Sequence, residues 1–335
     1  MAASIAILGG GPSGATLAGL LAQRGLKPVL FADEKAPNLL VGESLIPAII
    51  PILRRLGVEE SVAEMATFKP GVSFVHPKAA KDLDFTFEPV EGVLPTYAYN
   101  VPRPAFDELL SDRAAELGVT KVRHRAKVVS AGDGRLELTP ESLAAAPCLE
   151  GRQPDWLVDA TGRNRLFART LDLPSKAGSR RDVAYFSHFE GCHHPKAAGQ
   201  VIITRLTQGW SWRIPLPEDR MSIGVVLDKS EAEDLGATAE ERLSAAIQRD
   251  PYLSEAAASA ERVSPVKTYA NYQLVSEHAH GPGWVQLGDA YGFVDPMLSP
   301  GLFMAMESAD ILADIFISYP EGPPLRALRS YQTIS

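Results

Sequence analysis

The feature that most constrains this chain is a glycine-rich turn between a strand pattern and a helix pattern near the start of the sequence. The apolar run Ser4 to Leu8 ends at Gly9-Gly10-Gly11-Pro12-Ser13-Gly14, and the helical pattern Ala15 to Arg24 follows. A second apolar run, Val29 to Ala32, is typical of a buried strand. In this context G-x-G-x-x-G lets the backbone approach a pyrophosphate, and the helix N-terminus favours its charge. The sequence therefore predicts a doubly wound, Rossmann-like α/β domain that binds a dinucleotide; the alternative is a tight turn without a ligand.

The same fingerprint expects an acidic residue at the end of the second strand. Asp33 and Glu34 directly follow Ala32. A carboxylate at this place accepts hydrogen bonds from ribose hydroxyls. We favour Asp33, and the alternative is that either acid is solvated at the strand end.

Composition excludes several classes of protein. The 335 residues include 33 Lys+Arg and 41 Asp+Glu, a net charge of −8, which argues against nucleic acid or an anionic membrane as partner. Two cysteines are too few for a disulfide scaffold or a cysteine metal site. His193 and His194 are adjacent and would point to opposite faces of a strand, so no metal is expected. The N-terminus lacks a signal-peptide pattern, and charges interrupt the apolar stretch Leu302 to Ile317, so we expect a cytoplasmic protein.

The rest of the chain changes character in its middle. Glu43 to Leu56 and Pro104 to Leu117 have helical patterns, although prolines should bend the first. Alternating runs between Asp182 and Leu227 predict antiparallel strands. Trp284 to Asp289 is a buried strand pattern ending in a polar turn, and Leu302 to Ser318 is a long helix pattern. We therefore predict a discontinuous dinucleotide-binding domain with an inserted, mostly antiparallel β substrate domain: the first covers 1–70, 100–180 and 281–335, the second 71–99 and 181–280.

Three stretches together resemble the flavoprotein monooxygenase fold, in which FAD lies extended across a doubly wound domain. They are the N-terminal glycine turn, Asp159-Ala160-Thr161-Gly162 after an apolar strand, and Gly288-Asp289-Ala290. In that family the Gly-Asp carboxylate binds the ribityl chain of the flavin, which suits a group that only accepts hydrogen bonds. Arg103 matches an arginine often found near the cofactor; the alternative is a helix-start arginine paired with Asp107. The resemblance implies FAD, held by Gly9, Gly11, Pro12, Ser13, Gly14, Asp33, Glu34, Glu43, Ser44, Arg103, Asp159, Gly162, Gly288, Asp289, Pro296, Gly301 and Leu302.

Two further motifs are more specific. Trp210-Ser211-Trp212-Arg213-Ile214-Pro215 is a complete W-x-W-x-I-P, the signature of flavin-dependent halogenases, formed by Trp210, Trp212, Ile214 and Pro215. Its two tryptophans would share one face of a strand. Gly42 to Pro47 resembles the G-E-[SA]-x-[IL]-P segment of the same family. Taken alone, the tryptophans would be a pair of core aromatics.

Lys69 lies where that family keeps its catalytic lysine. In the family, reduced flavin, dioxygen and halide give hypohalous acid, which travels through the protein to the substrate. A buried ammonium that hydrogen-bonds this acid, or captures it as a haloamine, fixes where the halogen is delivered. Lysine suits this role because its pKa moves readily on burial. The alternative is a solvated surface lysine.

The segment Asp295 to Leu302 departs from the family pattern. Leu298 stands where tryptophan halogenases have a glutamate, which points to phenols or pyrroles, whose rings need less activation. The loop of Ser299, Pro300 and Gly301 is expected to face the flavin and the halide, with Ser299 in the catalytic site. Pro300 offers no N–H to the halide, so either halide binds weakly or the protein uses none.

The resemblance implies an FADH2-dependent halogenase that needs dioxygen and chloride or bromide. No second dinucleotide fingerprint is evident, so a separate NAD(P)H-dependent flavin reductase is expected as partner. A chain that ends soon after the flavin loop would leave an open site, suited to a large or carrier-protein-bound aromatic substrate as well as a small one. The alternatives are a flavin-dependent monooxygenase or dehydrogenase without halide, one version of which acts on a peptide, and a flavin-binding protein without turnover.

Overall fold

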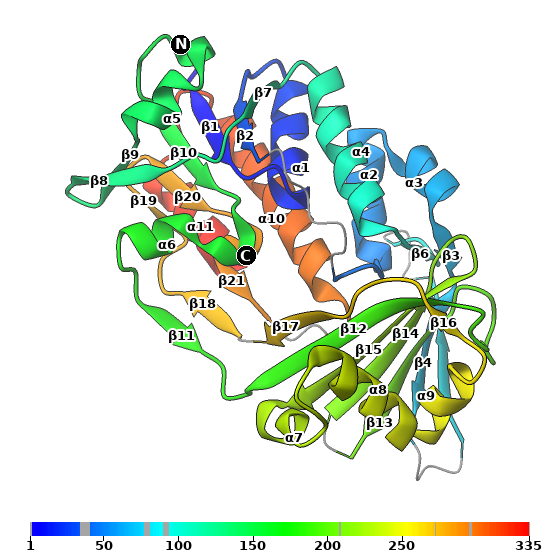
Figure 1. Cartoon of the computed structure of the whole chain (residues 1–335). Helices are drawn as coiled ribbons and strands as arrows, with labels where there is room; N and C mark the ends of the chain where they lie inside the picture. The colour runs from blue at the N-terminus through cyan, green and yellow to red at the C-terminus, as the bar shows by residue number, and fades with distance from the viewer. Residues whose placement is uncertain are drawn as a thin grey trace.

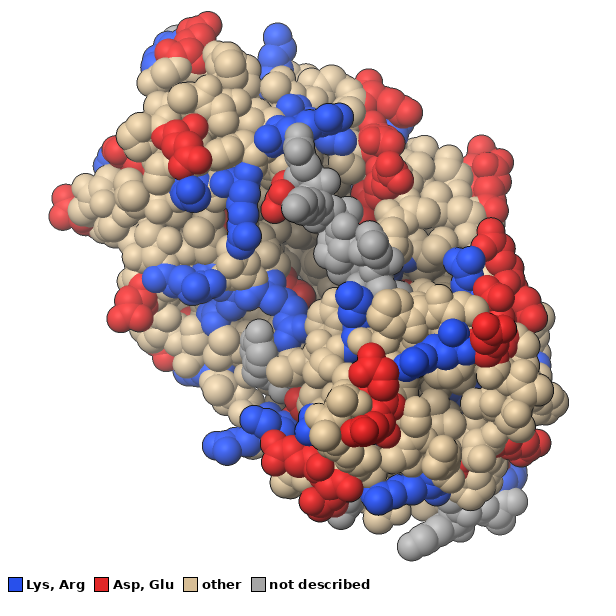
Figure 2. Space-filling model, in the orientation of Figure 1, with Lys and Arg blue, Asp and Glu red and all other residues tan. Residues whose placement is uncertain are grey.

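The computed structural model describes residues 2–33, 41–76, 81–89, 94–207, 209–271, 273–294 and 297–334. Within these ranges the chain builds two large sheets (Figure 1). One is mostly parallel and carries helices on its faces, and the other is mostly antiparallel. On the molecular face in Figure 2, acidic and basic side chains are interspersed.

The described residues contain a six-stranded sheet in the order β19-β20-β10-β1-β2-β7, in which the five strands from β20 to β7 are parallel. Its strands are β1 (Ile5–Leu8), β2 (Val29–Ala32), β7 (Thr120–Arg123), β10 (Trp156–Asp159), β19 (His280–Gly281) and β20 (Trp284–Gln286). Ile5 and Ile7 pack into one core cluster, and Ala6 and Leu8 pack into another on the opposite face. Burial on both faces explains why these strands are continuous apolar runs. The doubly wound prediction is confirmed.

The larger core cluster packs one face of this sheet against helices. These are α1 (Pro12–Ala22), α2 (Ile50–Leu56), α3 (Glu59–Met65), α4 (Arg103–Glu116), α10 (Pro300–Ser318) and α11 (Leu325–Ile334). The opposite face is covered by shorter elements: β8 (Val128–Gly132), β9 (Arg135–Leu138), α5 (Pro140–Ala144), η2 (Pro147–Leu149) and α6 (Leu166–Thr170). Several helices begin with proline in the first turn, where the missing N–H has no intrahelical partner to lose.

The segment Glu43 to Leu56 is not the single helix that its periodicity predicts. Ser44 is extended and forms an isolated bridge with Asn100. A 3-10 turn, η1 (Pro47–Ile49), follows, and α2 begins only at Ile50. The two prolines explain the difference, because each fits only the first turn of a helix and so breaks the segment into short pieces.

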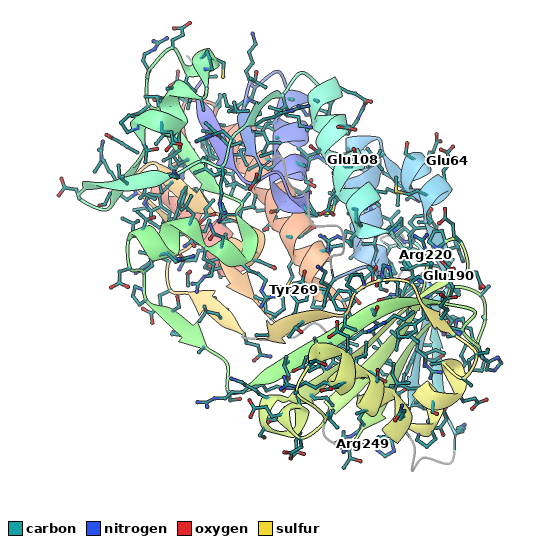
Figure 3. All side chains as sticks on the ribbon, viewed as in Figure 1. Glu64, Glu108, Glu190, Arg220, Arg249 and Tyr269 are labelled. Atoms are coloured by element: carbon teal, nitrogen blue, oxygen red, sulfur yellow. The ribbon has the colours of Figure 1, made fainter. Side chains whose placement is uncertain are left out.

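The second large sheet within the described ranges has eight strands, and all but the β13–β4 pairing are antiparallel. They are β4 (Gly71–Val75), β5 (Leu83–Thr86), β12 (Asp182–Glu190), β13 (Val201–Leu206), β14 (Gly209–Pro215), β15 (Arg220–Asp228), β16 (Glu261–Arg262) and β17 (Lys267–Asn271). Its outer face packs under α7 (Lys229–Glu233), α8 (Ala239–Arg249) and α9 (Pro251–Ala256). Arg220 and Glu190 pair at one end of the sheet, and Tyr269 lies on the side facing the parallel sheet (Figure 3). The inserted, mostly antiparallel unit is confirmed; the residue boundaries given above for the two domains stay a prediction.

Two small sheets connect the large ones. One consists of β11 (Ser175–Ala177), β18 (Leu274–Ser276) and β21 (Gly292–Phe293). The other pairs β3 (Thr67–Lys69) with β6 (Ala98–Asn100), so that Lys69 lies opposite Ala98. The remaining short turns are η3 (Gly162–Asn164) and η4 (Gly288–Ala290).

Gly224 tests how tightly the inner face of the antiparallel sheet is packed. A Cβ at this position would lie 2.1 Å from Cζ2 of Trp212, the residue paired with it on β14. We expect Gly224→Ala to lower the free energy of unfolding by about 1–3 kcal/mol, because overpacking a core displaces side chains. Denaturant unfolding measures this. In Gly301→Ala the new Cβ would meet nothing within 4 Å, so this control should unfold at or above the wild-type midpoint; equal stability of both variants would contradict the packing.

Candidate functional site

A cavity of about 550 Å³ lies between the two large sheets. Four loops that follow parallel strands reach it: the glycine turn after β1, Asp33 after β2, the turn after β10 and Asp289 after β20. Ligands of doubly wound folds bind at this carboxyl edge. The opposite wall is the inner face of the antiparallel sheet, with Ala184, Val201, Ile203, Trp210, Trp212, Ile214, Val226 and Tyr269.

The glycine turn provides room at the start of α1. Gly9 has a φ of +119°, and a Cβ there would lie 2.2 Å from the Ala160 oxygen. A Cβ at Gly14 would lie 2.0 Å from the Gly9 oxygen, whereas one at Gly11 would meet nothing within 4 Å. Gly9 and Gly14 therefore allow the turn to close, and Gly11 leaves open space on the cavity side. Gly9, Gly11, Pro12 and Ser13 all line the cavity, while Gly14 lies behind it.

Asp159 was predicted to contact the cofactor, but it does not line the cavity. Its side chain is fully buried, and its Oδ1 accepts from the N–H of Thr161 at 2.9 Å and the hydroxyl at 2.6 Å. Its Oδ2 accepts from the N–H of Phe167 at 2.8 Å. Burial raises the pKa of Asp159, and these hydrogen bonds oppose that shift. The carboxylate thus holds the turn in shape, and Thr161 and Gly162 reach the cavity in its place.

Asp289 does line the cavity, on the 3-10 turn that follows β20. Gly288 before it has a φ of +57°, a conformation that favours glycine. Burial raises the pKa of Asp289 to about 6, while the charges of Arg163 and Arg103 oppose the rise. The carboxylate is therefore ionised at neutral pH and offers acceptor oxygens to a ligand.

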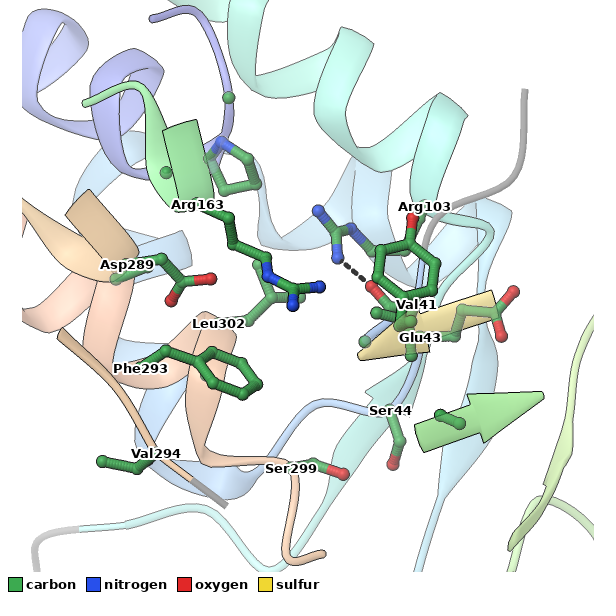
Figure 4. A pocket seen from close by; sticks show the side chains of 18 of the residues that line it. Val41, Glu43, Ser44, Arg103, Arg163, Asp289, Phe293, Val294, Ser299 and Leu302 are labelled. Carbon is green, nitrogen blue, oxygen red and sulfur yellow. Dashed lines mark hydrogen bonds between the residues drawn. The ribbon is translucent and has the colours of Figure 1, made fainter. Parts of the chain in front are cut away.

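Two arginines face each other across the cavity (Figure 4). Arg103 pairs with Asp107 at 2.9 Å and donates to the Val41 oxygen, so the predicted ion pair forms, and the same arginine also lines the cavity. Arg163 was not predicted. Its Cζ lies 5.4 Å from the ring centroids of Tyr269 and Phe293, and it donates to a backbone oxygen of β17. Arg163 directly follows Gly162 in the predicted turn, and from this position its place in the cavity could have been predicted.

The tryptophan motif forms an apolar wall of the cavity. Trp210, Trp212 and Ile214 share one face of β14, as predicted, and all three line the cavity. The centroids of the two indole rings lie 5.6 Å apart, and Trp212 Nε1 donates to Ser222 Oγ at 3.2 Å. Pro215 is buried but does not reach the cavity.

The loop before α10 reaches the cavity through Ser299, and the first turn of α10 reaches it through Gly301 and Leu302. Ser299 adopts a left-handed conformation with φ of +57°. Pro300 is the first residue of α10 and does not line the cavity, and Leu298 is 62% exposed. Two predicted cofactor contacts, Glu34 and Pro296, lie outside the described residues.

Lys69 is 1% exposed, so it is not a solvated surface lysine. Its Nζ donates to Ser44 Oγ at 2.8 Å and to the Leu45 oxygen at 2.7 Å, and it lies 5.4 Å from the centroid of the Phe87 ring. Burial lowers the pKa of Lys69 to about 7. Lys69 does not line the cavity, but Ser44 does. The ammonium therefore lies one side chain behind the cavity wall.

Glu43, the neighbour of Ser44, links the two sheets. Its carboxylate is 2% exposed, and Oε1 lies 2.6 Å from Nε2 of His188 on β12. The segment that holds Lys69 is thus tied to the antiparallel sheet. The sequence around Glu43 or His188 does not predict this pairing, because the two residues are 145 positions apart.

Two kinds of feature are absent from the described ranges. No three His, Cys, Asp or Glu side chains there gather in a group that could hold a metal ion. No helix in the same ranges is both long and apolar enough to cross a membrane.

Comparisons with known proteins agree on one family. The tryptophan halogenase family profile matches residues 4–94 and 88–323. A 1H-pyrrole-2-carbonyl-[peptidyl-carrier protein] chlorinase of Pseudomonas fluorescens is 31% identical over 337 residues, covering 92% of this chain and 74% of that protein. A tryptophan 2-halogenase of Chondromyces crocatus is 30% identical over 324 residues, covering 92% of this chain and 60% of that protein.

Solved structures show the same fold. The myxobacterial chondrochloren halogenase CndH superposes with a TM-score of 0.84 at 27% identity, over 99% of this chain and 78% of that one. The flavin-dependent brominase Bmp2 has a TM-score of 0.85 at 23% identity, over 99% of this chain and 83% of that one. Since the family profile covers nearly the whole chain and the cavity carries the family's glycine turn, Gly-Asp turn and tryptophan motif, the chain belongs to the tryptophan halogenase family of FAD-dependent enzymes.

Proposed function

We propose that this protein halogenates an activated aromatic ring, a pyrrole carried as a 2-carbonyl thioester on a peptidyl carrier protein. The observation that carries the proposal is Lys69, a buried ammonium one side chain behind the wall of a cofactor-sized cavity. The named activities of two relatives, a chlorinase and a brominase of this carrier-bound pyrrole, support the substrate class.

The residues around the cavity fit FAD. Gly11 and the N-terminus of α1 suit the diphosphate, Asp289 suits the ribityl hydroxyls, and Arg103 and Arg163 supply positive charge. When bound and reduced, FAD supplies with dioxygen the oxidising power that converts chloride or bromide to hypohalous acid. A separate NAD(P)H-dependent flavin reductase would provide the reduced cofactor. We infer a cytoplasmic enzyme, in keeping with two free cysteines.

Lys69 would direct the halogen to the ring. In this step a ring carbon of the pyrrole bonds the halogen with a π electron pair, and the oxygen–halogen bond breaks. The departing hydroxide takes a proton from the Lys69 ammonium and leaves as water. The halogenated ring carbon then loses its hydrogen as a proton, which restores the aromatic ring and returns the Lys69 amine to the ammonium. A lysine whose pKa lies near 7 is about half protonated at neutral pH and releases its proton readily.

The loop before α10 supports both a halide and an activated ring. Pro300 lacks an N–H, but it occupies the first position of the helix, and the N–H groups of Gly301 and Leu302 in the first turn remain available to an anion. Leu298 places no carboxylate at the cavity. A pyrrole is suited to such a site, because its nitrogen lone pair activates the ring.

The direct test uses the protein with FAD, NADH, a flavin reductase and pyrrole-2-carbonyl carrier protein, in chloride or bromide. Mass spectrometry reads the halogen isotope pattern on the carrier-bound pyrrole, with free pyrroles and phenols as parallel substrates. Halogenated carrier-bound product supports the proposal. Oxygenated or dehydrogenated product without halogen in both salts would instead establish a monooxygenase or dehydrogenase.

Lys69→Met should abolish halogenation and yet stabilise the protein below pH 7. A shift from 10.5 to about 7 makes the buried ammonium cost about 5 kcal/mol, at 1.36 kcal/mol per pKa unit. Methionine leaves Ser44 Oγ and the Leu45 oxygen without their partner, which offsets about 1–2 kcal/mol each, the lower part of the usual range because Ser44 also lines the cavity. We expect a net gain of about 1–3 kcal/mol at pH 6 in urea unfolding.

The pH dependence of that gain follows from the direction of the shift. Below pH 7 the lysine is protonated in both states, and the destabilisation is complete. Between pH 7 and 10.5 the unfolded chain binds more protons, so wild-type stability rises with pH and the advantage of methionine shrinks. Lys127→Met, at a side chain 60% exposed, is the matched control and should change stability by less than about 0.5 kcal/mol. A gain for Lys69→Met that does not depend on pH would refute the buried ammonium.

The pH profile of the wild type distinguishes two roles for Lys69. If the ammonium donates to hypohalous acid, the yield of halogenated pyrrole per FADH2 consumed should fall as pH rises through about 7. If the free amine captures the halogen, the yield should rise over the same interval. Chloride and bromide are compared because their hypohalous acids ionise at different pH, whereas the Lys69 midpoint is the same in both salts.

Asp289→Ala should weaken FAD binding about tenfold or more, as expected for lost hydrogen bonds to a charged acceptor. Fluorescence titration gives the dissociation constant. Asp289→Asn retains one acceptor oxygen and should lose less affinity. An unchanged affinity in the alanine variant would show that this carboxylate does not bind the cofactor.

A further inference from the structure

Asn100 presents a buried oxygen for which the described part of the chain supplies no hydrogen-bond donor. The residue is 0% exposed, and its Nδ2 donates to the Gly199 oxygen at 3.0 Å, while Oδ1 has no partner. Because a carbonyl oxygen only accepts, the amide must turn its nitrogen toward Gly199 and its oxygen to the other side. A buried acceptor without a donor is unfavourable, and it points to a bound molecule that supplies one.

The strand register places this oxygen on the same side as Lys69. Thr67 lies opposite Asn100 and Lys69 lies opposite Ala98, in antiparallel pairing of β3 with β6. Ser44 bridges to Asn100 from the other edge. Paired residues, and residues two apart on a strand, project to one face. Lys69, Ser44 and Asn100 therefore share a face.

The opposite face of the same strands is aromatic. The rings of Phe68 and Tyr97 stack with centroids 5.6 Å apart. The Tyr97 and Tyr99 rings meet edge to face, also with centroids 5.6 Å apart. The polar face is thus distinct from the aromatic one. On the polar face Lys69 uses two of its three N–H groups, toward Ser44 Oγ and the Leu45 oxygen, which leaves one donor on the face that also carries Asn100.

Gly199 fixes the orientation of the Asn100 amide. It has a φ of +76°, and a Cβ there would lie 1.8 Å from the Phe68 oxygen, so only glycine allows this loop to reach the strand pair. Two residues later Val201 begins β13 and lines the cavity. The loop that pins Asn100 is therefore continuous with the cavity wall.

We infer that Asn100 Oδ1 and Lys69 Nζ together hold the hypohalous acid, an inference that rests on the proposed function. Hypohalous acid has one O–H donor and an oxygen that accepts. Its O–H would donate to Asn100, its oxygen would accept from Lys69, and the halogen would face the ring. Asn100 leaves the balance of the step unchanged: the ring supplies the electron pair that bonds the halogen, the Lys69 proton converts the departing hydroxide to water, and the proton lost from the ring carbon restores the ammonium.

The test is Asn100→Leu, which removes the acceptor at similar volume. Three quantities are measured: the FAD dissociation constant, halogenated carrier-bound pyrrole per FADH2 consumed, and escaped hypohalous acid trapped by monochlorodimedone. We expect unchanged FAD affinity, a roughly tenfold lower yield on the pyrrole, the order expected for one lost hydrogen bond, and a matching rise in trapped halogen. Thr67→Val removes a hydroxyl directly opposite on the same face and should change none of the three.

Asn100→Ser is examined in parallel, because it retains a small hydroxyl but not the amide oxygen and remains informative if the leucine variant does not fold. Wild-type yield without escaped halogen in either folded variant would overturn the inference. So would equal losses of FAD affinity, thermal stability and yield, which indicate a purely structural asparagine. If the wild type itself makes no halogenated product, the proposed function fails and the inference fails with it.

Discussion

The site depends on keeping one ammonium out of water. Lys69 is buried with a pKa near 7, and it is held there by a hydroxyl and a backbone oxygen from the segment Gly42 to Pro47. A helix would use its own carbonyls and could not offer the Leu45 oxygen in this way. The prolines at 47 and 51 prevent a helix until Ile50, so the segment stays extended and carries Ser44 to the cavity wall.

The same extended segment joins the two sheets. Glu43 points to His188 on β12, and the Val41 oxygen accepts from Arg103 at the start of α4. One short stretch is therefore fixed to the antiparallel sheet by a buried pair and to the parallel unit by a guanidinium. These contacts set the distance between the carboxyl edge of the parallel sheet and the face of β14 that carries Trp210 and Trp212. The cavity, and Lys69 behind it, follow from that separation.

Local patterns made much of the fold predictable from sequence. The order of β1, glycine turn, α1 and β2 is readable because its periodicity and its glycines are adjacent in the chain, and the alternation of Trp210 and Trp212 gives their shared face directly. Asp159 was misassigned because a carboxylate at a strand end looks the same whether it meets a ligand or the N–H of Phe167. Asn100 could not be found, because its amide is oriented by a glycine 99 residues away.

The loop before α10 shows how a site can lose two family features and still support the chemistry. Pro300 removes a donor at the helix position where the N–H has no intrahelical partner, so the remaining first-turn amides keep the end of α10 attractive to an anion. Leu298 turns outward and puts no second charge near Lys69. A carboxylate near the lysine would raise its pKa and hold its proton more tightly. Without one, burial alone sets the acidity of Lys69, and the reactivity that the protein does not supply must come from the ring.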